Sequence, residues 1–275
     1  MEFCRTAIFS DLDGTLFDSH QRVSERNKEA IRAYTAAGGL FAIATGRGYQ
    51  NAMRFLDGIV LNAPCIVYNG AGVYDPASGT YPYTVFIDHE ATMEALTWAA
   101  ENVPTMDVQA YAEQMTYYVS PKAYANPELV RQLQPNEFVP LETVRELPLF
   151  KTMHRGMPQD TERLREYLRE SGIADRVAVV YGIADIEPRY EHTELLPKGA
   201  DKGTALNACR KMPIYAGRTL FAIGDYRNDL ELLEQADVAC CPSNASEDIK
   251  AVADHVLCSN EDGAIAALIE KLSVL

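Results

Sequence analysis

Short runs of consecutive apolar residues, each followed by polar residues, mark the first 75 positions of the chain. Residues 6–9, 40–44 and 65–68 form such runs, and each ends in a polar or glycine-containing stretch. Between the first two runs, Ser24 is a good N-cap for an amphipathic helix, which a pair of glycines would end. Unbroken apolar strands separated by helices predict a parallel sheet that is covered on both faces.

The same alternation returns near the end of the chain. The pattern predicts a helix over residues 204–211, a buried strand over 219–223, a helix that begins near Asn228 and a strand over 238–241. Because the two ends follow one pattern, we expect them to build one doubly wound core together.

The middle of the chain differs, because strand-like pieces there follow one another at short spacing. The predicted elements are helices over 90–101 and 161–170 and strands over 108–111, 115–119, 150–154 and 176–181. Strand pairs joined by short turns are typical of a mixed α+β module. The predicted fold class is therefore α/β, with a Rossmann-like parallel-sheet core formed by residues 1–84 and 191–275 and an inserted α+β domain at 85–190. The segment 184–192, where the chain would return to the core, is long and charged.

Composition narrows the possible partners. The chain has 275 residues, of which 47% are apolar, and a formal net charge of −14, which argues against nucleic acid as a partner. A small anionic ligand remains compatible with this charge, since a bound cation can reverse the local field. The six cysteines are scattered without CxxC spacing, so we expect reduced thiols rather than zinc ligands or disulfides.

The chain shows no targeting or membrane signal. Arg5, Asp11 and Asp13 interrupt the first apolar residues too early for a signal peptide. No apolar run reaches the roughly 20 residues that a membrane helix needs. We expect a soluble cytoplasmic protein with no membrane partner, and the sequence leaves its oligomeric state open.

Polar side chains follow the predicted parallel strands at the point where each strand ends. Asp11 and Asp13 follow the first strand, Thr45 the second, Asn69 the third and Asp225 the strand near the end of the chain. Ligands of open α/β sheets bind beyond the carboxyl ends of the strands, so these side chains would meet in one cleft. The three carboxylates are hard oxygen ligands that suit Mg²⁺, whereas no His or Cys cluster supports zinc.

Each of these features also has a simpler explanation. Residues 11–15 are common in turns, but they do not fit a calcium loop, since Gly14 falls two positions early. Asp229 fits the first turn of a helix, where acids are favoured, whereas Asp225 ends a buried strand. Lys202 alone would be taken as a surface lysine. It lies near a helix N-terminus, however, where the macrodipole disfavours a cation unless an anion is close by.

Four segments, in this order, resemble the motifs of the haloacid dehalogenase-like superfamily. They are Asp11-Leu12-Asp13-Gly14-Thr15-Leu16, Ala44-Thr45-Gly46-Arg47, Asp201-Lys202-Gly203-Thr204-Ala205-Leu206 and Gly224-Asp225-Tyr226-Arg227-Asn228-Asp229. Residues 68–71, 243–245 and 260–263 further resemble the Cof-type sugar-phosphate phosphatases, whose inserted cap is of type IIB. Ser243 departs from that subgroup, which usually has glycine there.

The resemblance implies a Mg²⁺-dependent phosphatase that hydrolyses small phosphate monoesters, sugar phosphates or related metabolites. Asp11 would be the nucleophile and carry an aspartyl-phosphate, and Asp13 would act as general acid and then as base. Asp11, the backbone carbonyl of Asp13 and Asp225 would bind Mg²⁺. The residues that the resemblance implies for substrate binding are Thr45, Gly46, Arg47, Asn69, Lys202 and Asn228.

Two other activities stay open at this point. A phosphotransferase or mutase would use the same intermediate, and a phosphate-binding module that lost catalysis would keep only part of the motif set. Phosphorylated sugars, pyridoxal phosphate and flavin mononucleotide are all possible substrates. Candidates for the inserted domain's contribution are Tyr111, Tyr117, Tyr118, His154 and Arg189, although most such residues are core aromatics or solvated charges.

Overall fold

The computed structural model describes residues 2–133, 135–183 and 190–274, and the chain folds into two compact units. The core unit comprises residues 1–84 and 200–275, and the inserted unit comprises residues 85–199. The predicted fold class is confirmed, since a parallel sheet lies in the core unit and a mixed α+β arrangement in the inserted unit.

A five-stranded parallel sheet forms the centre of the core unit, in the order β14-β13-β12-β1-β2. Its strands are β1 (Thr6–Ser10), β2 (Leu40–Ile43), β12 (Thr219–Ile223), β13 (Val238–Cys241) and β14 (His255–Val256). Residues of β1 pair with β12 on one side and β2 on the other, so the two ends of the chain meet at the middle of the sheet. This is the arrangement that the apolar runs predicted.

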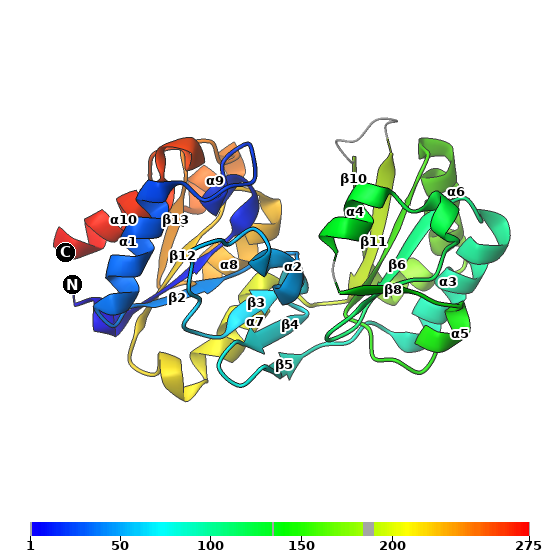
Figure 1. The fold of residues 1–275 in the computed structure, drawn as a ribbon, viewed down its shortest axis with the longest axis horizontal. Helices are drawn as coiled ribbons and strands as arrows, with labels where there is room; N and C mark the ends of the chain where they lie inside the picture. Colours follow the sequence, from blue (N-terminus) through cyan, green and yellow to red (C-terminus); the bar gives the residue numbers. More distant parts are fainter. Residues whose placement is uncertain (1, 134, 184–189, 275) are drawn as a thin grey trace. The chain divides into compact units, whose positions relative to one another are not determined.

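Helices cover both faces of this sheet (Figure 1). They are α1 (Glu25–Ala36), α2 (Tyr49–Met53), α7 (Lys202–Arg210), α8 (Leu230–Gln235), α9 (Glu247–Val252) and α10 (Ala264–Val274). Helix α1 packs against α10, and α7 packs against α8. The predicted N-cap of α1 is confirmed, since the Ser24 side chain accepts a hydrogen bond from the Asn27 amide.

A small antiparallel sheet continues the core unit beside β2. It consists of β3 (Cys65–Val67), β4 (Gly72–Asp75) and β5 (Thr80–Thr84). A parallel bridge joins Ala44 to Ile66, so β3 runs alongside the residues that follow β2. The polar segments after these two strands therefore come to the same edge.

The inserted unit is built on a six-stranded sheet in the order β10-β11-β9-β6-β7-β8, antiparallel except for the β7–β8 pair. The strands are β6 (Asp107–Tyr111), β7 (Thr116–Tyr118), β8 (Asn136–Phe138), β9 (Lys151–Gly156), β10 (Val177–Ile183) and β11 (Glu191–Pro197). The helices are α3 (His89–Asn102), α4 (Pro127–Gln132), α5 (Leu141–Val144) and α6 (Pro158–Glu170). Apolar residues of α3 and α6 pack with one face of the sheet into a separate hydrophobic core.

The boundary expected at residue 191 is wrong by about one strand. Strand β11 pairs with β9 on one side and with β10 on the other, so residues 191–197 are central to the inserted sheet. The strand begins with the charged residues Glu191 and His192, which hid its pattern in the sequence. The core unit resumes at residue 200.

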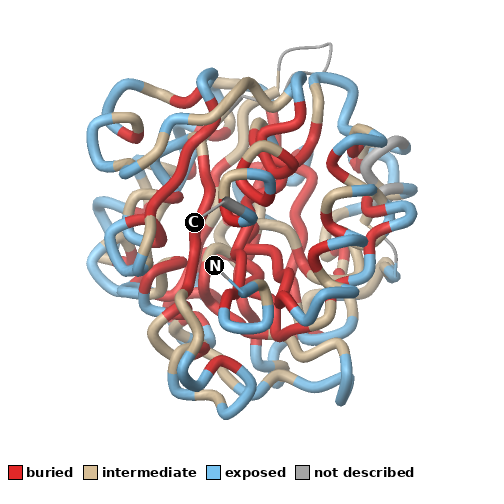
Figure 2. Tube along the Cα trace, turned by 90° about the vertical axis from the view of Figure 1, so that its left-hand side faces the viewer, coloured by how far each residue is buried: buried red, intermediate tan, exposed pale blue. Residues whose placement is uncertain are grey.

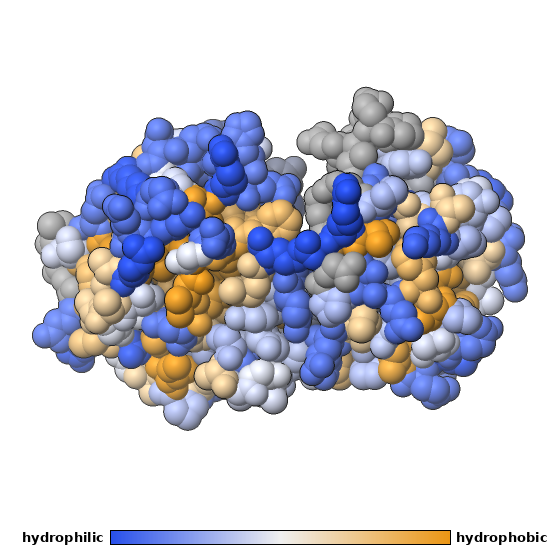
Figure 3. Space-filling model, in the orientation of Figure 1, coloured by the Kyte–Doolittle hydropathy of each residue, from blue (hydrophilic) through white to orange (hydrophobic). Residues whose placement is uncertain are grey.

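Burial follows the strands of both units. The central strands are drawn mostly as buried in Figure 2, whereas the outer turns of the helices and the loops are exposed. Much of the face seen in Figure 3 is hydrophilic, with apolar side chains gathered in patches on each unit. Among the described residues, no helix combines the length and the apolar character that crossing a membrane would require.

Candidate active site

The predicted site residues of the core unit lie at the carboxyl ends of neighbouring strands. Asp11 directly follows β1, and its amide donates to the carbonyl of Ile223 at the end of β12 (2.9 Å). The Thr45 amide donates to Ile66 of β3 (3.0 Å), and the Asn69 amide donates to Thr45 (3.0 Å). These backbone bonds fix the loops after the strands against one another, as the topology predicts.

A buried lysine joins two of the acidic side chains. Lys202 is the first residue of α7 and is fully buried. Its Nζ donates to Asp11 Oδ1 and to Asp229 Oδ1, at 2.6 Å in each case. Two carboxylates thus compensate a cation at a helix N-terminus, where it would otherwise be unfavourable. The sequence indicated that Lys202 needs an anion close by, and Asp11 and Asp229 supply that negative charge.

Asp229 was not among the predicted site residues. The sequence explained it as an acid in the first turn of a helix, and its Oδ2 does accept from the amides of Asp225 (3.0 Å) and Tyr226 (3.2 Å). Its second oxygen binds Lys202, and the side chain is fully buried. Its place in the motif 224–229 was the only sequence signal for this role.

Three carboxylates converge at this end of the sheet. Oxygen atoms of Asp11, Asp225 and Asp229 lie within 4.8 Å of one another. Burial raises the pKa of Asp11 although Lys202 opposes it, and Asp229 and Asp225 raise it further. Burial likewise raises the pKa of Asp225 to about 6. The cluster holds three carboxyl groups against one ammonium group, so it offers a set of oxygen ligands suited to a metal cation.

The loop after β1 needs glycine to admit Asp225. Gly14 has a φ of +81°, and a Cβ there would lie 2.4 Å from Asp225 Oδ2. The neighbouring Thr15 hydroxyl donates to Asp225 Oδ1 (2.8 Å), and Asn244 holds the Gly14 carbonyl (2.8 Å). Residues 11–15 thus form a turn, as their composition suggested. The same turn also holds the Asp225 carboxylate, which comes from the loop after β12.

Asp13 is bound by an arginine from the loop that follows β2. Arg47 donates from Nε to Asp13 Oδ2 (2.9 Å) and from Nη2 to Oδ1 (2.6 Å), and 52% of the Asp13 side chain is exposed. The guanidinium lies 4.5 Å from the centre of the Phe55 ring and 5.7 Å from that of Phe17. The two hydrogen bonds to Asp13 and the contacts with the rings of Phe17 and Phe55 together hold the Arg47 side chain in one orientation.

The remaining predicted substrate-binding residues form one group. Thr45 Oγ1 accepts from the Arg47 amide (3.1 Å), and Asn228 donates to Asn69 Oδ1 (3.3 Å). A Cβ at Gly46 would lie 2.9 Å from the same Asn69 oxygen, so this position favours glycine. The core unit thus brings all the predicted site residues to one edge of its sheet.

Most residues of the inserted unit that the sequence offered as substrate contacts are buried in its core. His154 is fully buried, its Nε2 lies 3.1 Å from Thr152 Oγ1, and burial lowers its pKa to about 4. It is a core histidine, as the simpler explanation had it. Tyr111 and Tyr118 are also buried, and Tyr117 is half-buried against the hydrophobic core. Arg189 lies outside the described residues.

A parallel sheet with convergent carboxylates and a buried lysine at its carboxyl edge is the arrangement in which open α/β proteins bind their ligands. The sequence model of the haloacid dehalogenase-like hydrolase family matches residues 8–269, and the chain belongs to this family. The resemblance drawn from the four motifs is therefore confirmed.

The chain is also similar to individual proteins and to solved structures. The chain is 27% identical over 94% of its length to endoribonuclease YBEY, chloroplastic, of Arabidopsis thaliana, and spans 45% of that protein. It is 26% identical over 96% of its length to phosphatase YwpJ of Bacillus subtilis, of which it spans 99%. The solved structure of a sugar phosphatase of haloacid dehalogenase subclass IIB has a similar fold, with a TM-score of 0.71 and 20% identity over 98% of this chain and 100% of that one.

Proposed function

We propose that the protein is a Mg²⁺-dependent phosphatase that hydrolyses small phosphate monoesters through an aspartyl-phosphate on Asp11. One observation carries this proposal most strongly, the buried Lys202 bound to Asp11 beside two further carboxylates. Positive charge from Lys202, and from a divalent cation when it is bound, would offset the repulsion between the Asp11 carboxylate and a phosphate dianion.

In the first step, an oxygen of Asp11 forms a bond to phosphorus. Lys202 binds Oδ1, so Oδ2 is the oxygen we assign to the attack. The bond from phosphorus to the ester oxygen breaks, and its electron pair stays on that oxygen. A proton from Asp13 neutralises the leaving alkoxide.

In the second step, Asp13 takes a proton from a water molecule. The water oxygen forms a bond to phosphorus, and the bond from phosphorus to Asp11 breaks. Inorganic phosphate leaves, and the Asp11 carboxylate is restored. Arg47 donates to both carboxylate oxygens of Asp13, which suits the base form required in this step, so one of the two bonds has to open when Asp13 carries the proton of the first step.

The other side chains would bind and orient the phosphoryl group. Thr45 and Lys202 are assigned to its oxygens, and Gly46, Arg47, Asn69 and Asn228 to the wall of the site. Asp11, the backbone carbonyl of Asp13 and Asp225 would hold Mg²⁺, and Asp229 would support them through Lys202. Bound there, the metal ion would supply positive charge to the phosphoryl oxygens.

The partner we propose is a small phosphorylated metabolite, of which sugar phosphates are one class. The name of phosphatase YwpJ supports a phosphorylated substrate, and the net charge of −14 argues against nucleic acid. We also propose a cytoplasmic location, to which the free thiols of all six cysteines are suited.

A phosphate-release assay tests the proposal. The chain should release inorganic phosphate from some members of a panel of phosphate esters when Mg²⁺ is present, and Asp11→Asn should abolish this release with the fold unchanged by circular dichroism. Stoichiometric phosphate release separates a phosphatase from a phosphotransferase or mutase. Normal turnover by Asp11→Asn, or turnover with Mg²⁺ fully chelated, would contradict the proposal.

A further inference from the structure

The turn that follows Asp11 sets the direction of one backbone carbonyl. Asp13 has φ −75° and ψ 116°, and Gly14 has φ 81° and ψ −2°. These are the dihedral angles of the two central residues of a type II turn. A type I turn would need a ψ of about −30° at Asp13 and a φ of about −90° at Gly14, which would point the Asp13 carbonyl to the other side. The direction of this carbonyl in the site therefore depends on the turn type and on how the turn is held.

An asparagine from a distant segment holds this turn. Asn244 Nδ2 donates to the Gly14 carbonyl (2.8 Å), and Asn244 Oδ1 accepts from the Asn260 amide (3.0 Å). Both ends of the side-chain amide are thus bonded, although the residue is exposed. The Gly14 carbonyl belongs to the peptide unit directly after the one that carries the Asp13 carbonyl. The bond from Asn244 therefore fixes the turn next to the carbonyl whose direction matters.

The segment that contains Asn244 also holds the loop of Asp225. The Ser246 amide donates to the Asp225 carbonyl (3.0 Å), and the Thr15 hydroxyl donates to Asp225 Oδ1 (2.8 Å). A Cβ at Gly14 would lie 2.4 Å from Asp225 Oδ2, so the turn and the carboxylate are in close contact. Asn244 and Ser246, two positions apart, thus tie the two acidic loops to one another.

The partner of Asn244 holds the same segment at a second point. Asn260 Nδ2 donates to the Phe17 carbonyl (2.8 Å). Phe17 lies beyond the turn, and its amide already donates to the Leu12 carbonyl (2.8 Å). This second hold is therefore one of two at Phe17. Residues 243–245 and 260–263 resembled a phosphatase subgroup in the sequence, and the proposed mechanism uses neither segment.

We propose that Asn244 is a positioning residue of the metal site, which keeps the Asp13 carbonyl in the one direction that the turn gives it. The inference rests on the proposed function, because that carbonyl is assigned there to Mg²⁺. Mg²⁺ demands near-ideal octahedral geometry from its ligands. A turn that carries its carbonyl out of place for part of the time lowers the affinity by the fraction of time that it is in place.

A role in folding alone predicts a different result. An asparagine that only stabilises the core unit would lower the free energy of unfolding when it is replaced, and the turn and the Mg²⁺ affinity of the folded protein would stay the same. A positioning residue changes both of these in a protein that is still folded. The two readouts therefore separate positioning from stabilisation.

The test variant is Asn244→Ala, which removes both hydrogen bonds of the side chain and leaves every proposed ligand in place. Because Asn244 is exposed, the change leaves no cavity. The matched control is Asn260→Ala. It also removes an asparagine-to-carbonyl bond of 2.8 Å from the segment after Asp11, but it keeps the backbone amide that donates to Asn244. Urea unfolding verifies that each variant is folded.

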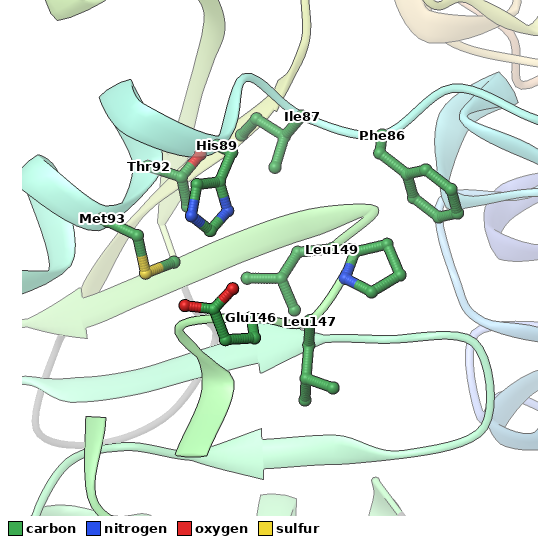
Figure 4. Close-up of a pocket in the computed structure, with 9 residues that line it drawn as sticks. Phe86, Ile87, His89, Thr92, Met93, Glu146, Leu147 and Leu149 are labelled. Atoms are coloured by element: carbon green, nitrogen blue, oxygen red, sulfur yellow. The ribbon is translucent and has the colours of Figure 1, made fainter. Parts of the chain in front are cut away.

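A second control lies in the inserted unit. Asn102 is exposed and donates from Nδ2 to the Trp98 carbonyl (2.9 Å). It is the last residue of α3, at the other end of the helix from His89, Thr92 and Met93, which line a cavity of about 360 Å³ (Figure 4). Asn102→Ala thus removes the same kind of bond outside both this cavity and the acidic cluster.

Two measurements on the full chain address the proposal. Calorimetry without substrate gives the Kd for Mg²⁺. The ¹⁵N relaxation of the Gly14 and Thr15 amides in the metal-free protein reports whether the turn moves. Because the second measurement needs no metal, it still judges the hold on the turn if the wild type binds no Mg²⁺. Absence of Mg²⁺ binding by the wild type would contradict the proposed function, and a newly mobile turn in Asn244→Ala would then still support the hold by Asn244.

Asn244→Ala should weaken Mg²⁺ binding by roughly threefold to tenfold, the range expected for the loss of one hydrogen bond. The same variant should make the Gly14 and Thr15 amides mobile. Asn260→Ala and Asn102→Ala should change the Kd by no more than about twofold and leave both amides rigid. An unchanged Kd in folded Asn244→Ala, an equal loss of affinity in Asn260→Ala, or weaker binding with unchanged relaxation of the turn would overturn the inference.

Discussion

Replacing Asp225 by asparagine tests the charge balance of the acidic cluster directly. The amide side chain would keep an oxygen for the Thr15 hydroxyl, which now donates to Asp225 Oδ1 at 2.8 Å, and the change would remove one negative charge. The folded protein raises the pKa of Asp225 from 3.8 to about 6, first through burial. A raised carboxyl pKa means that the folded state binds the proton more tightly than the unfolded state does. The contribution to stability is therefore complete below pH 3.8 and is lost as the pH rises through about 6.

The size of the effect follows from this shift. A shift of about two pKa units at about 1.36 kcal/mol each gives roughly 3 kcal/mol. Asp225 is only partly buried, so screening by solvent reduces the expected effect to about 1–2 kcal/mol. Without divalent cations at pH 8, Asp225→Asn should thus be more stable to unfolding than the wild type by this amount, and below pH 3.8 the two should be equal.

With Mg²⁺ present, the wild type should be more stable to unfolding than Asp225→Asn. A ligand at 100 times its Kd stabilises the folded state by about 2.7 kcal/mol, and the variant, lacking one ligand, should gain less. Urea unfolding at pH 8 measures the stability difference between variant and wild type in EDTA, and then the stabilisation of each protein by Mg²⁺. Asp88→Asn is the control of opposite sign, because the pKa of Asp88 is lowered by the Ala91 amide and Arg176, so this variant should lose stability at pH 8 with or without Mg²⁺. The reasoning is refuted if Asp225→Asn is less stable than the wild type in EDTA, or if Mg²⁺ stabilises both equally.

Three further variants test other parts of the site. Lys202→Met leaves Asp11 and Asp229 without their buried cation, so it should cost about 3–5 kcal/mol in urea unfolding and abolish phosphate release. Gly14→Ala places a Cβ against Asp225, so it should weaken Mg²⁺ binding measured by calorimetry, whereas Gly217→Ala, also at positive φ but with open space around its Cβ, should not. Asp13→Asn should slow turnover and leave phosphoenzyme detectable after acid quench; unchanged steady-state rates would contradict the acid–base role.

Local patterns made most of the core unit predictable. The strands over residues 219–223 and 238–241 end where the apolar runs end, because strands buried on both faces must be continuously apolar. Ser24 caps its helix because the capping bond is local in the chain. Asp11, Asp13, Thr45 and Asp225 could be placed at one edge because the carboxyl ends of parallel strands share it.

What the sequence did not reveal depends on contacts between distant residues. Asp229 binds Lys202 across 27 positions, and no local pattern distinguishes that from an ordinary helix start. Strand β11 was missed because its charged first residues pair within a sheet whose partner strands lie elsewhere in the chain. The ion pair between Asp107 and Arg155 becomes visible only when β6 and β9 are paired.

Acid-quench trapping of the phosphoenzyme tests the central proposal most directly. The chain is mixed with a ³²P-labelled phosphate ester and Mg²⁺, quenched within the first turnover, digested and mapped by mass spectrometry. We predict label on the peptide that contains Asp11, and none when Asp11→Asn or EDTA is used. Phosphate released in the first turnover with no label on any peptide, or label on another residue, would contradict the account.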